Sequence, residues 1–344
     1  MEMSVEKKER KIDSKKVKEW LLGSGIYLVL FLLIIVIIAK EPTFLSIRNF
    51  KNILTQSSVK LIIALGVAGI IVTQGTDLSA GRQVGLSAVV SATLLQSVTN
   101  VNKVFPGLGD IPIIVVIGVV VLVGALMGAI NGFVVAKLKV TPFIATLGSM
   151  IIIYGINSLY YDYVGASPVA GFDGRFSKFA QGSLNIGITE IPYLIIYATI
   201  ATVFMWVLWN KTKFGKNLFA VGGNPEAATV SGVNVTMSLM KVYVLSGMFY
   251  AFAGLLEAGR IGSATNNLGN MYELDAIAAC VVGGVSFSGG VGKVQGVVTG
   301  VLIFTVINYG LTYVGVNPYW QFIIKGLIII MAVALDTMKY TKKK

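Results

Sequence analysis

The sequence predicts an all-α protein that crosses a membrane many times. Of its 344 residues, 55% are hydrophobic and only 13% are charged, and the mean hydropathy is +0.79. A soluble domain of average composition carries about 25% charged residues, so most side chains of this chain have no water to face. Apolar runs long enough to cross about 30 Å of hydrocarbon recur along the chain, without the short alternating pattern of a membrane β-barrel.

Ten apolar segments are the candidate spans, so we expect about ten transmembrane helices in a single domain over 21–338. Two of them are short and rich in glycine and serine, which favours broken or tilted helices. The first is longer than the hydrophobic region of a signal peptide and no small-residue cleavage site follows it, so we expect an uncleaved helix. In order, the segments are 21–39, 53–73, 83–98 (short), 111–136, 141–161, 191–209, 238–257, 273–286 (short), 294–314 and 318–337.

The distribution of lysine and arginine predicts which side of the membrane each loop faces. The net charge is +12, and with the N-terminus inside, nineteen of the 28 lysines and arginines fall on cytoplasmic segments. These segments include the basic N-terminal residues 1–20, the polar loop 210–237 and the basic tail 339–344. Because basic residues are retained in the cytoplasm, we expect both termini inside. The other explanation of the charge, nucleic-acid binding, is disfavoured because the chain has no basic soluble domain interleaved with aromatic residues.

A weak internal repeat relates the two halves of the chain. Residues 124–153 resemble residues 300–330 when shifted by 176 positions, which places Pro142 on Pro318. With five helices in each half, the halves would be inverted with respect to each other, a common plan of transporters. Chance similarity between two apolar helical hairpins is the alternative.

Glycines recur at a spacing of four, as at Gly124 and Gly128 and at Gly296 and Gly300. Small residues at this spacing let the backbones of two membrane helices approach closely. We therefore expect these glycines to serve helix packing rather than ligand binding.

Several kinds of chemical site are disfavoured by the residues present. There is no histidine, and the single cysteine, Cys280, lies in an apolar run, so we expect no metal site, no cofactor and no catalytic residue. Residues 281–296 resemble a phosphate-binding loop, but Phe287 replaces its first glycine and Val294 follows Lys293 where serine or threonine is needed. The chain therefore has no recognisable ATP site of its own.

Polar residues interrupt the apolar sequence at 71–90, where Asp77, Ser79 and Arg82 lie between two spans. A charge at the bilayer centre costs about 2.5–3.5 kcal/mol on insertion scales, so such residues usually face a bundle interior, a cavity or an interface. Two compatible interpretations follow. Either a broken helix lines a solute path here, or Asp77 caps a helix that begins near Leu78 and Arg82 lies near the membrane surface.

Two further groups of side chains are candidates at the outer side. Tyr154 and Asn157, with two tyrosines that follow them, repeat at helical spacing near the outer end of the span 141–161. A pore lined by tyrosine and asparagine suits a neutral polyhydroxylated solute, whereas tyrosine at an interface is usually an anchor. Acidic and basic residues also flank the hairpin 262–272, which either gates the outer mouth, contacts a partner, or simply has solvated helix ends.

The most distinctive polar stretch is 210–241, which lies between two long apolar segments. Pro225 and then Glu226 suit the start of a helix, because proline is preorganised there and the macrodipole favours an acid. Gly232 suits its end. The sequence therefore predicts a cytoplasmic helix of about two turns that docks into a groove of another protein, or an ordinary loop helix.

At these residues the chain resembles the permease subunits of bacterial ABC-type sugar importers of the ribose and galactose group. Residues 226–232, EAATVSG, match the Glu-Ala-Ala-x-x-x-Gly pattern of importer permeases, and TKFGKNLFAVGGN (212–224) and TDLSAG (76–81) resemble the sugar group specifically. The match extends from about residue 21 to residue 340.

The resemblance implies a homodimeric permease in the bacterial cytoplasmic membrane that imports galactose or methyl galactoside-type sugars. It implies an ATPase subunit on the cytoplasmic side and an external sugar-binding protein. The resemblance assigns contact with the ATPase to the coupling segment, which comprises Gly222, Gly223, Asn224, Pro225, Glu226, Ala227, Ala228 and Gly232.

Two other functions compete with this one. A secondary, ion-coupled sugar transporter needs buried titratable relay residues, and it leaves 210–241 without a role. A membrane enzyme needs paired carboxylates, a nucleophile with its base, or metal ligands within the membrane, and no such set is evident.

Overall fold

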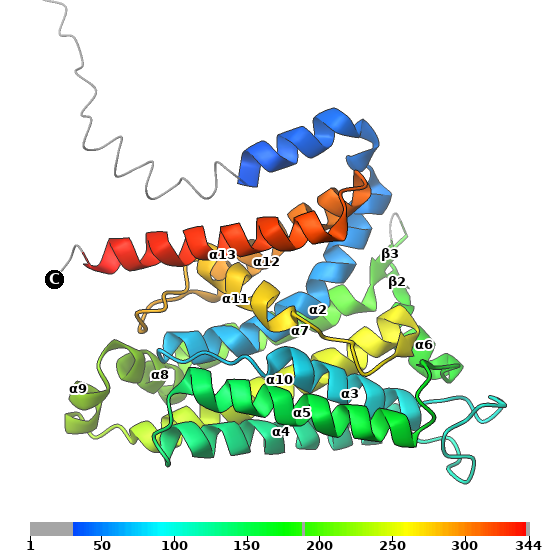
Figure 1. The fold of residues 1–344 in the computed structure, drawn as a ribbon, viewed down its shortest axis with the longest axis horizontal. Helices are drawn as coiled ribbons and strands as arrows, with labels where there is room; N and C mark the ends of the chain where they lie inside the picture. The colour runs from blue at the N-terminus through cyan, green and yellow to red at the C-terminus, as the bar shows by residue number, and fades with distance from the viewer. Residues whose placement is uncertain (1–29, 188–189, 342–344) are drawn as a thin grey trace, which may run out of the picture.

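The computed structural model describes residues 30–187 and 190–341, and its regular structure is mostly helical (Figure 1). The predicted basic segment 1–20, the start of the first span and residues 342–344 of the predicted tail lie outside the described residues. Each of the ten predicted spans overlaps one helix of the described residues. These are Leu30–Lys40, α2 (Ile47–Val72), α3 (Ala80–Leu94), α4 (Ile113–Ala136), α5 (Pro142–Tyr163), α7 (Tyr193–Lys211), α10 (Val235–Ile261), α11 (Tyr272–Val282), α12 (Val294–Tyr313) and α13 (Pro318–Thr341).

Six of the helices within 30–187 and 190–341 are long and apolar enough to cross a membrane, namely α2, α4, α5, α7, α10 and α12. The first and last predicted spans contain shorter apolar stretches, Leu30–Lys40 and Pro318–Ala334. The two segments predicted to be short form α3, with 15 residues, and α11, with 11 residues. As predicted, the helices at these two places are shorter than a full membrane crossing.

The loops contain short elements, and of these only the helix that begins at Pro225 was predicted from the sequence. Three short α-helices are α6 (Gly174–Gln181), α8 (Lys213–Gly223) and α9 (Pro225–Val230), and a 3-10 helix, η1, covers Pro42–Phe44. Two antiparallel pairs of strands also form, in which loop segments satisfy each other's backbone N–H and C=O groups. They are β1 (Val169–Ala170) with β4 (Ser263–Ala264), in which Val169 faces Ala264, and β2 (Ser183–Asn185) with β3 (Glu190–Pro192), in which Ser183 faces Pro192.

The long helices lie side by side, with α8 and α9 at one end of the bundle and α6, β2 and β3 at the other (Figure 1). α2 and α10 form the centre. α10 packs against α3 and α4, and α2 packs against α11 and α12. The most apolar 18-residue window of α2 is 78% buried, whereas the corresponding window of α4 is 22% buried.

Glycines allow these helices to approach closely. A Cβ atom at Gly124 would overlap the carbonyl oxygen of Gly247 on α10, and one at Gly128 would overlap the carbonyl oxygen of Tyr243. In the same way, a Cβ atom at Gly300 on α12 would overlap a carbonyl oxygen of α11. The predicted packing role of the glycines at a spacing of four is thus confirmed. Close backbone approach matters in lipid because no hydrophobic effect drives the helices together there.

Candidate functional site

The predicted helix after Asn224 is present as α9, and its start is fixed by local hydrogen bonding. Pro225 is its first residue, and the side chain of Asn224 accepts a hydrogen bond from the backbone N–H of Ala227 at 2.9 Å. This bond satisfies one of the backbone donors that a helix start leaves without a partner. Glu226 lies in the first turn, where the helix dipole favours an acid.

The end of α9 is a Schellman motif around Gly232. This glycine has a φ of +82°, and its N–H donates to the carbonyl of Thr229 at 2.9 Å. The N–H of Val233 donates to the carbonyl of Ala228 at 3.0 Å. Both bonds satisfy carbonyl groups at the helix end, and the left-handed conformation between them favours glycine. The predicted start and stop of this helix are therefore confirmed.

The exposed side of α9 is available for a partner. Ala228 is the residue that faces inward, with 4% of its surface exposed, whereas Glu226 and Ala227 are exposed. Val230 is 90% exposed, which is unusual for a valine. The helix lies at the outer edge of the bundle beside α8 (Figure 1).

The coupling segment is fastened to the membrane helices through Gly222. The side chain of Gln74, just after α2, donates to the carbonyl of Gly222 at 2.8 Å. The N–H of Gly290 donates to the carbonyl of Val72, the last residue of α2, at 2.8 Å. A Cβ atom at Gly222 would overlap the carbonyl oxygen of Val72. The end of α8, the end of α2 and the loop 283–293 therefore form one contact, which no local sequence signal reveals.

Asp77 and Ser79 lie in a buried hydrogen-bonded cluster. Asp77 Oδ1 accepts from the backbone N–H of Ser79 at 2.9 Å and from its Oγ at 2.6 Å. Ser79 Oγ in turn accepts from Gln83 Nε2 and from Asn131 Nδ2, both at 2.9 Å. All four side chains are at most 1% exposed. The cluster ties α4 to the turn before α3, and it has no open surface in this conformation.

The predicted cap by Asp77 is wrong in detail. α3 begins at Ala80, two residues later than the predicted start near Leu78, and Ser79 is its N-cap residue. Asp77 instead holds the turn that precedes the helix. The Asp77 carboxylate accepts hydrogen bonds from Ser79, two residues later, and such local bonding to the backbone competes with helix formation.

The structure separates Tyr154 from Asn157. Tyr154 is 39% exposed and its ring lies 4.2 Å from the Arg82 guanidinium carbon. Asn157 is 1% exposed, and its Nδ2 donates to the carbonyl of Asn266 at 3.2 Å. Tyr154 is the thirteenth of the 22 residues of α5, so Arg82 lies beside the middle of a membrane helix. The sequence interpretation placed Arg82 near the membrane surface, whereas its side chain contacts the middle of α5 and neither of its ends.

The hairpin 262–272 does not end in solvated charges. Glu257 is 3% exposed and accepts two hydrogen bonds from Arg260, at 2.7 and 2.8 Å, and one from the Tyr272 hydroxyl at 2.7 Å. Beyond Gly262 the chain turns back along α3, where a Cβ atom at Gly85 would overlap the carbonyl oxygen of Leu268. α11 therefore begins beside α3 within the bundle, which explains its short length.

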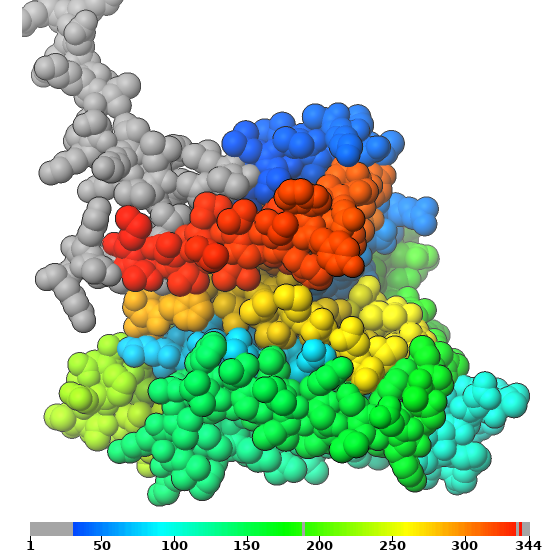
Figure 2. Space-filling model, viewed as in Figure 1, coloured from blue at the N-terminus to red at the C-terminus, as the bar shows by residue number. Residues whose placement is uncertain are grey.

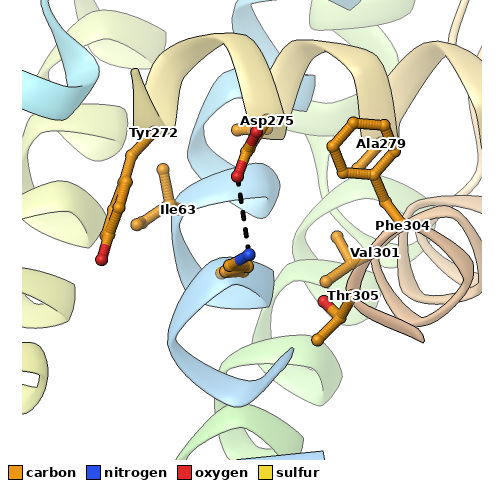
Figure 3. A pocket seen from close by; sticks show the side chains of 9 residues that line it. Ile63, Tyr272, Asp275, Ala279, Val301, Phe304 and Thr305 are labelled. Atoms are coloured by element: carbon orange, nitrogen blue, oxygen red, sulfur yellow. Dashed lines mark hydrogen bonds and ion pairs between the residues drawn. The ribbon is translucent and has the colours of Figure 1, made fainter. Parts of the chain in front are cut away.

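The sequence interpretation missed an ion cluster that joins three helices. Asp275 on α11 lies 3.5 Å from Lys60 Nζ on α2 and 2.9 Å from Lys325 Nζ on α13. The contact between Asp275 and α2 is drawn in Figure 3. The cavity beside it has a volume of about 10 Å³, enough for about one water molecule. The overlooked signal was a single lysine in each of two apolar runs.

At the opposite end of the bundle from α9, Asp173 caps α6. Its Oδ1 accepts from the backbone N–H of Arg175 at 2.7 Å and from Arg175 Nε at 3.0 Å. Arg175 Nη2 also lies 3.1 Å from Asp110 Oδ2. The hydrogen bonds from Arg175 hold the pKa of the Asp173 carboxyl below its usual value, although partial burial opposes them.

Comparison with known proteins is informative over nearly the whole chain. Residues 49–333 match the family model described as branched-chain amino acid transport system / permease component. The chain is 69% identical over 333 residues to the galactose/methyl galactoside import permease protein MglC of Salmonella typhimurium, which covers 97% of this chain and 99% of that protein. The MglC protein of Escherichia coli K12 gives the same identity and coverage. The ribose import permease protein RbsC of Bacillus subtilis is 38% identical over 318 residues, 92% of each chain. No solved structure matches the chain.

Proposed function

Because the chain belongs to the family of permease components described for branched-chain amino acid transport systems, we propose that it is the membrane-spanning subunit of an ATP-driven importer of galactose and methyl galactosides. The observation that carries this proposal is the 69% identity over 97% of the chain to an import permease for these sugars. The chain is a multi-pass membrane permease, and ATP hydrolysis belongs to a separate subunit.

The coupling segment is the surface on which that ATPase acts. α9 is well formed because its start is capped and its end is a Schellman motif. Its exposed side is accessible to a partner protein. Force applied to it reaches α10 directly and reaches α2 through Gly222 and Val72, whose backbones are in contact. The structure therefore supports a lever that also moves the loop 283–293, in addition to α7 and α10, which flank the segment in sequence.

The end of the bundle that carries α8 and α9 is the cytoplasmic end, and both termini lie on that side. Lysines gather there in loops and at helix ends, as expected for retained positive charge. The opposite end, with α6 and the β2–β3 hairpin, is where an external sugar-binding protein delivers its ligand. The lysines at the α8–α9 end are Lys137, Lys139, Lys211, Lys213, Lys216, Lys241 and Lys293.

The ten helices form two inverted repeats of five. The helix lengths recur in order, because α2 and α10 have 26 and 27 residues, α3 and α11 have 15 and 11, and α5 and α13 have 22 and 24. α5 begins at Pro142 and α13 at Pro318, the two prolines that the repeat aligns. The second helix of each half packs against the third and fourth helices of the other half. A permease of this plan works as a homodimer around a central path.

The proposal is tested by galactose uptake into proteoliposomes that hold the permease, the ATPase and the binding protein. Uptake should require ATP and the ATPase subunit, and a protonophore should leave it unchanged. Uptake that persists without the ATPase and collapses with the protonophore would show a secondary transporter instead.

The coupling role is tested by Glu226→Ala and Gly232→Ala in the same importer. Each variant should keep ATP hydrolysis but lose most sugar transport, because the ATPase no longer moves a well-formed α9. Ser231→Ala is the matched control, since Ser231 is exposed beside Gly232 but has an ordinary φ of −78°. Full transport by both Glu226→Ala and Gly232→Ala would contradict the role.

A further inference from the structure

Arg82 places a guanidinium group about halfway along the membrane helices. It lies 4.2 Å from the ring of Tyr154, which is the thirteenth of the 22 residues of α5. With a rise of 1.5 Å per residue, Tyr154 is about 18 Å from the start of α5 and about 14 Å from its end. Neither end of α5 is within reach of the Arg82 side chain, so its charge cannot extend to the membrane surface.

No carboxylate among the described residues forms an ion pair with Arg82. Its contacts are the Tyr154 ring and a hydrogen bond from Nη2 to Asn270 Oδ1 at 2.7 Å. The Arg82 Nη1 atom is buried and has no hydrogen-bond partner. The nearby Glu273 carboxylate lies against Gly81 and is likewise without a partner at its Oε2. Arg82 Nη1 is therefore a donor that no described protein atom satisfies, although it is covered in this conformation.

These residues lie on an exposed strip between two helices. The strip consists of the exposed residues Tyr154, Asn267 and Asn270 and of Arg82, which is half-buried, and it is bounded by α5 on one side and by α13 on the other. Figure 2 shows the region between green α5 and red α13, where cyan α3 and the yellow segment after α10 reach the surface. Asn267 and Asn270 are both exposed. The remaining exposed residues of α5 are mostly apolar, for example Ile151 and Ile152.

A strip of this composition is unsuited to lipid. A charge and two amides that face hydrocarbon at this depth would lose their hydration without compensation. Intramembrane charged residues usually face a water-filled cavity or a bundle interior. The strip therefore faces an aqueous space, which a second copy of the chain encloses in the assembled importer.

We propose that this strip is the wall of the translocation path that contacts the sugar, and that Arg82 binds hydroxyl groups of the monosaccharide as it passes. This inference rests on the proposed function. A guanidinium presents donors in a fixed planar fork, which matches adjacent hydroxyl oxygens of a neutral sugar. Tyr154 and Asn270 hold the plane of the fork, so little side-chain freedom is lost when the guanidinium engages the sugar.

Water access to the strip is tested by cysteine labelling, for which the chain is well suited. Its single cysteine, Cys280, is buried and is first replaced by serine. Asn267→Cys and Asn270→Cys are then compared with Leu122→Cys, a control that is 71% exposed and lies on α4, which contributes no residue to the strip. In the reconstituted importer, a charged, membrane-impermeant thiol reagent should label both strip cysteines at least about tenfold faster than the control, since only the thiolate in water reacts. Equal, slow labelling of all three would overturn the aqueous strip.

Sugar contact is tested by transport of galactose and of its 2-, 3-, 4- and 6-deoxy analogues, each at a concentration that saturates the binding protein. Arg82→Met should lower galactose transport by about tenfold or more, while ATP hydrolysis stimulated by the binding protein changes by less than about twofold. For at least one deoxy analogue the loss should be much smaller, because the hydroxyl that Arg82 binds is already absent. Arg82→Lys, which keeps the charge but not the fork, should resemble Arg82→Met.

A merely structural role of Arg82 predicts a different result, namely an equal loss for every analogue together with lower thermal stability. That result, or undiminished transport by Arg82→Met, would overturn the proposal. Failure of the proposed function is distinguishable, since the unmodified importer would then show no ATP-dependent galactose transport while the labelling result would stand unchanged.

Discussion

Asp275→Asn should be among the most damaging single changes to stability in this chain, although it is nearly isosteric. The carboxylate of Asp275 forms ion pairs with Lys60 on α2 at 3.5 Å and with Lys325 on α13 at 2.9 Å. The three side chains are 24%, 11% and 22% exposed in the order Lys60, Asp275, Lys325. Asparagine would leave two ammonium groups close together without a counter-charge.

The magnitude follows from the burial of the cluster. Removing one partner of a buried ion pair costs about 3–5 kcal/mol, because the remaining charge is left uncompensated. The partial exposure of the lysines places Asp275→Asn at the lower end, about 3 kcal/mol. Lys60→Met or Lys325→Met alone should be mild, since the carboxylate keeps one lysine. Combining both with Asp275→Asn should restore most of the stability, because similar apolar side chains often replace a buried ion cluster at no cost.

The assay is the half-life of the purified permease at a fixed temperature in detergent, read from the fraction that stays monodisperse. A rate suits a membrane protein whose unfolding is irreversible. A loss of about 3 kcal/mol corresponds to a half-life shorter by up to about a hundredfold. An Asp275→Asn variant as long-lived as the unmodified chain, or a triple variant as short-lived as the single one, would refute the reasoning.

Three further predictions concern packing, capping and pH. Gly128→Ala should destabilise the chain by about 1–3 kcal/mol because its Cβ overlaps the Tyr243 carbonyl, whereas Gly118→Ala on the same helix meets open space and should be neutral; the thermal half-lives of the two variants decide. Asn224→Ala should cost α9 about 1 kcal/mol of local stability and speed amide hydrogen exchange there about fivefold, with Ser231→Ala unchanged; equal exchange in both would contradict the cap. Because the folded-state pKa of Asp173 is lowered, its contribution to α6 should be full above the ordinary aspartate pKa of about 3.9 and be lost as the pH falls through the lowered value. Amide exchange of α6 from pH 7 to pH 3 tests this, and exchange in Asp173→Asn should show no such pH dependence.

The start and stop of α9 illustrate what local sequence decides. Asn224, Pro225 and Gly232 each act on backbone groups within about four residues, so their pattern specifies the helix without knowledge of the rest of the fold. The ten apolar segments could be predicted for a similar reason, since the thickness of the hydrocarbon core and the hydropathy of the chain constrain each segment separately. The two short helices were likewise visible in their composition, although not the reason for their length.

The candidate path residues show where local reasoning fails. Tyr154 and Asn157 are three residues apart on one helix, yet one is exposed and the other is buried against Asn266. The rotation of α5 about its axis decides this, and that rotation depends on its neighbours. α4, with a mean hydropathy of 3.1 in its best window, has no polar face that would indicate its orientation.

By itself, the sequence determined the class of protein, the positions of the helices and the two ends of α9, because these depend on hydropathy and on short-range backbone chemistry. Only the tertiary structure decided which polar residues meet. It joined Lys60 to Asp275 across 215 positions and laid Arg82 on Tyr154. Such pairs depend on the depth and rotation of helices that are distant in the chain, and no pattern within a single segment records them.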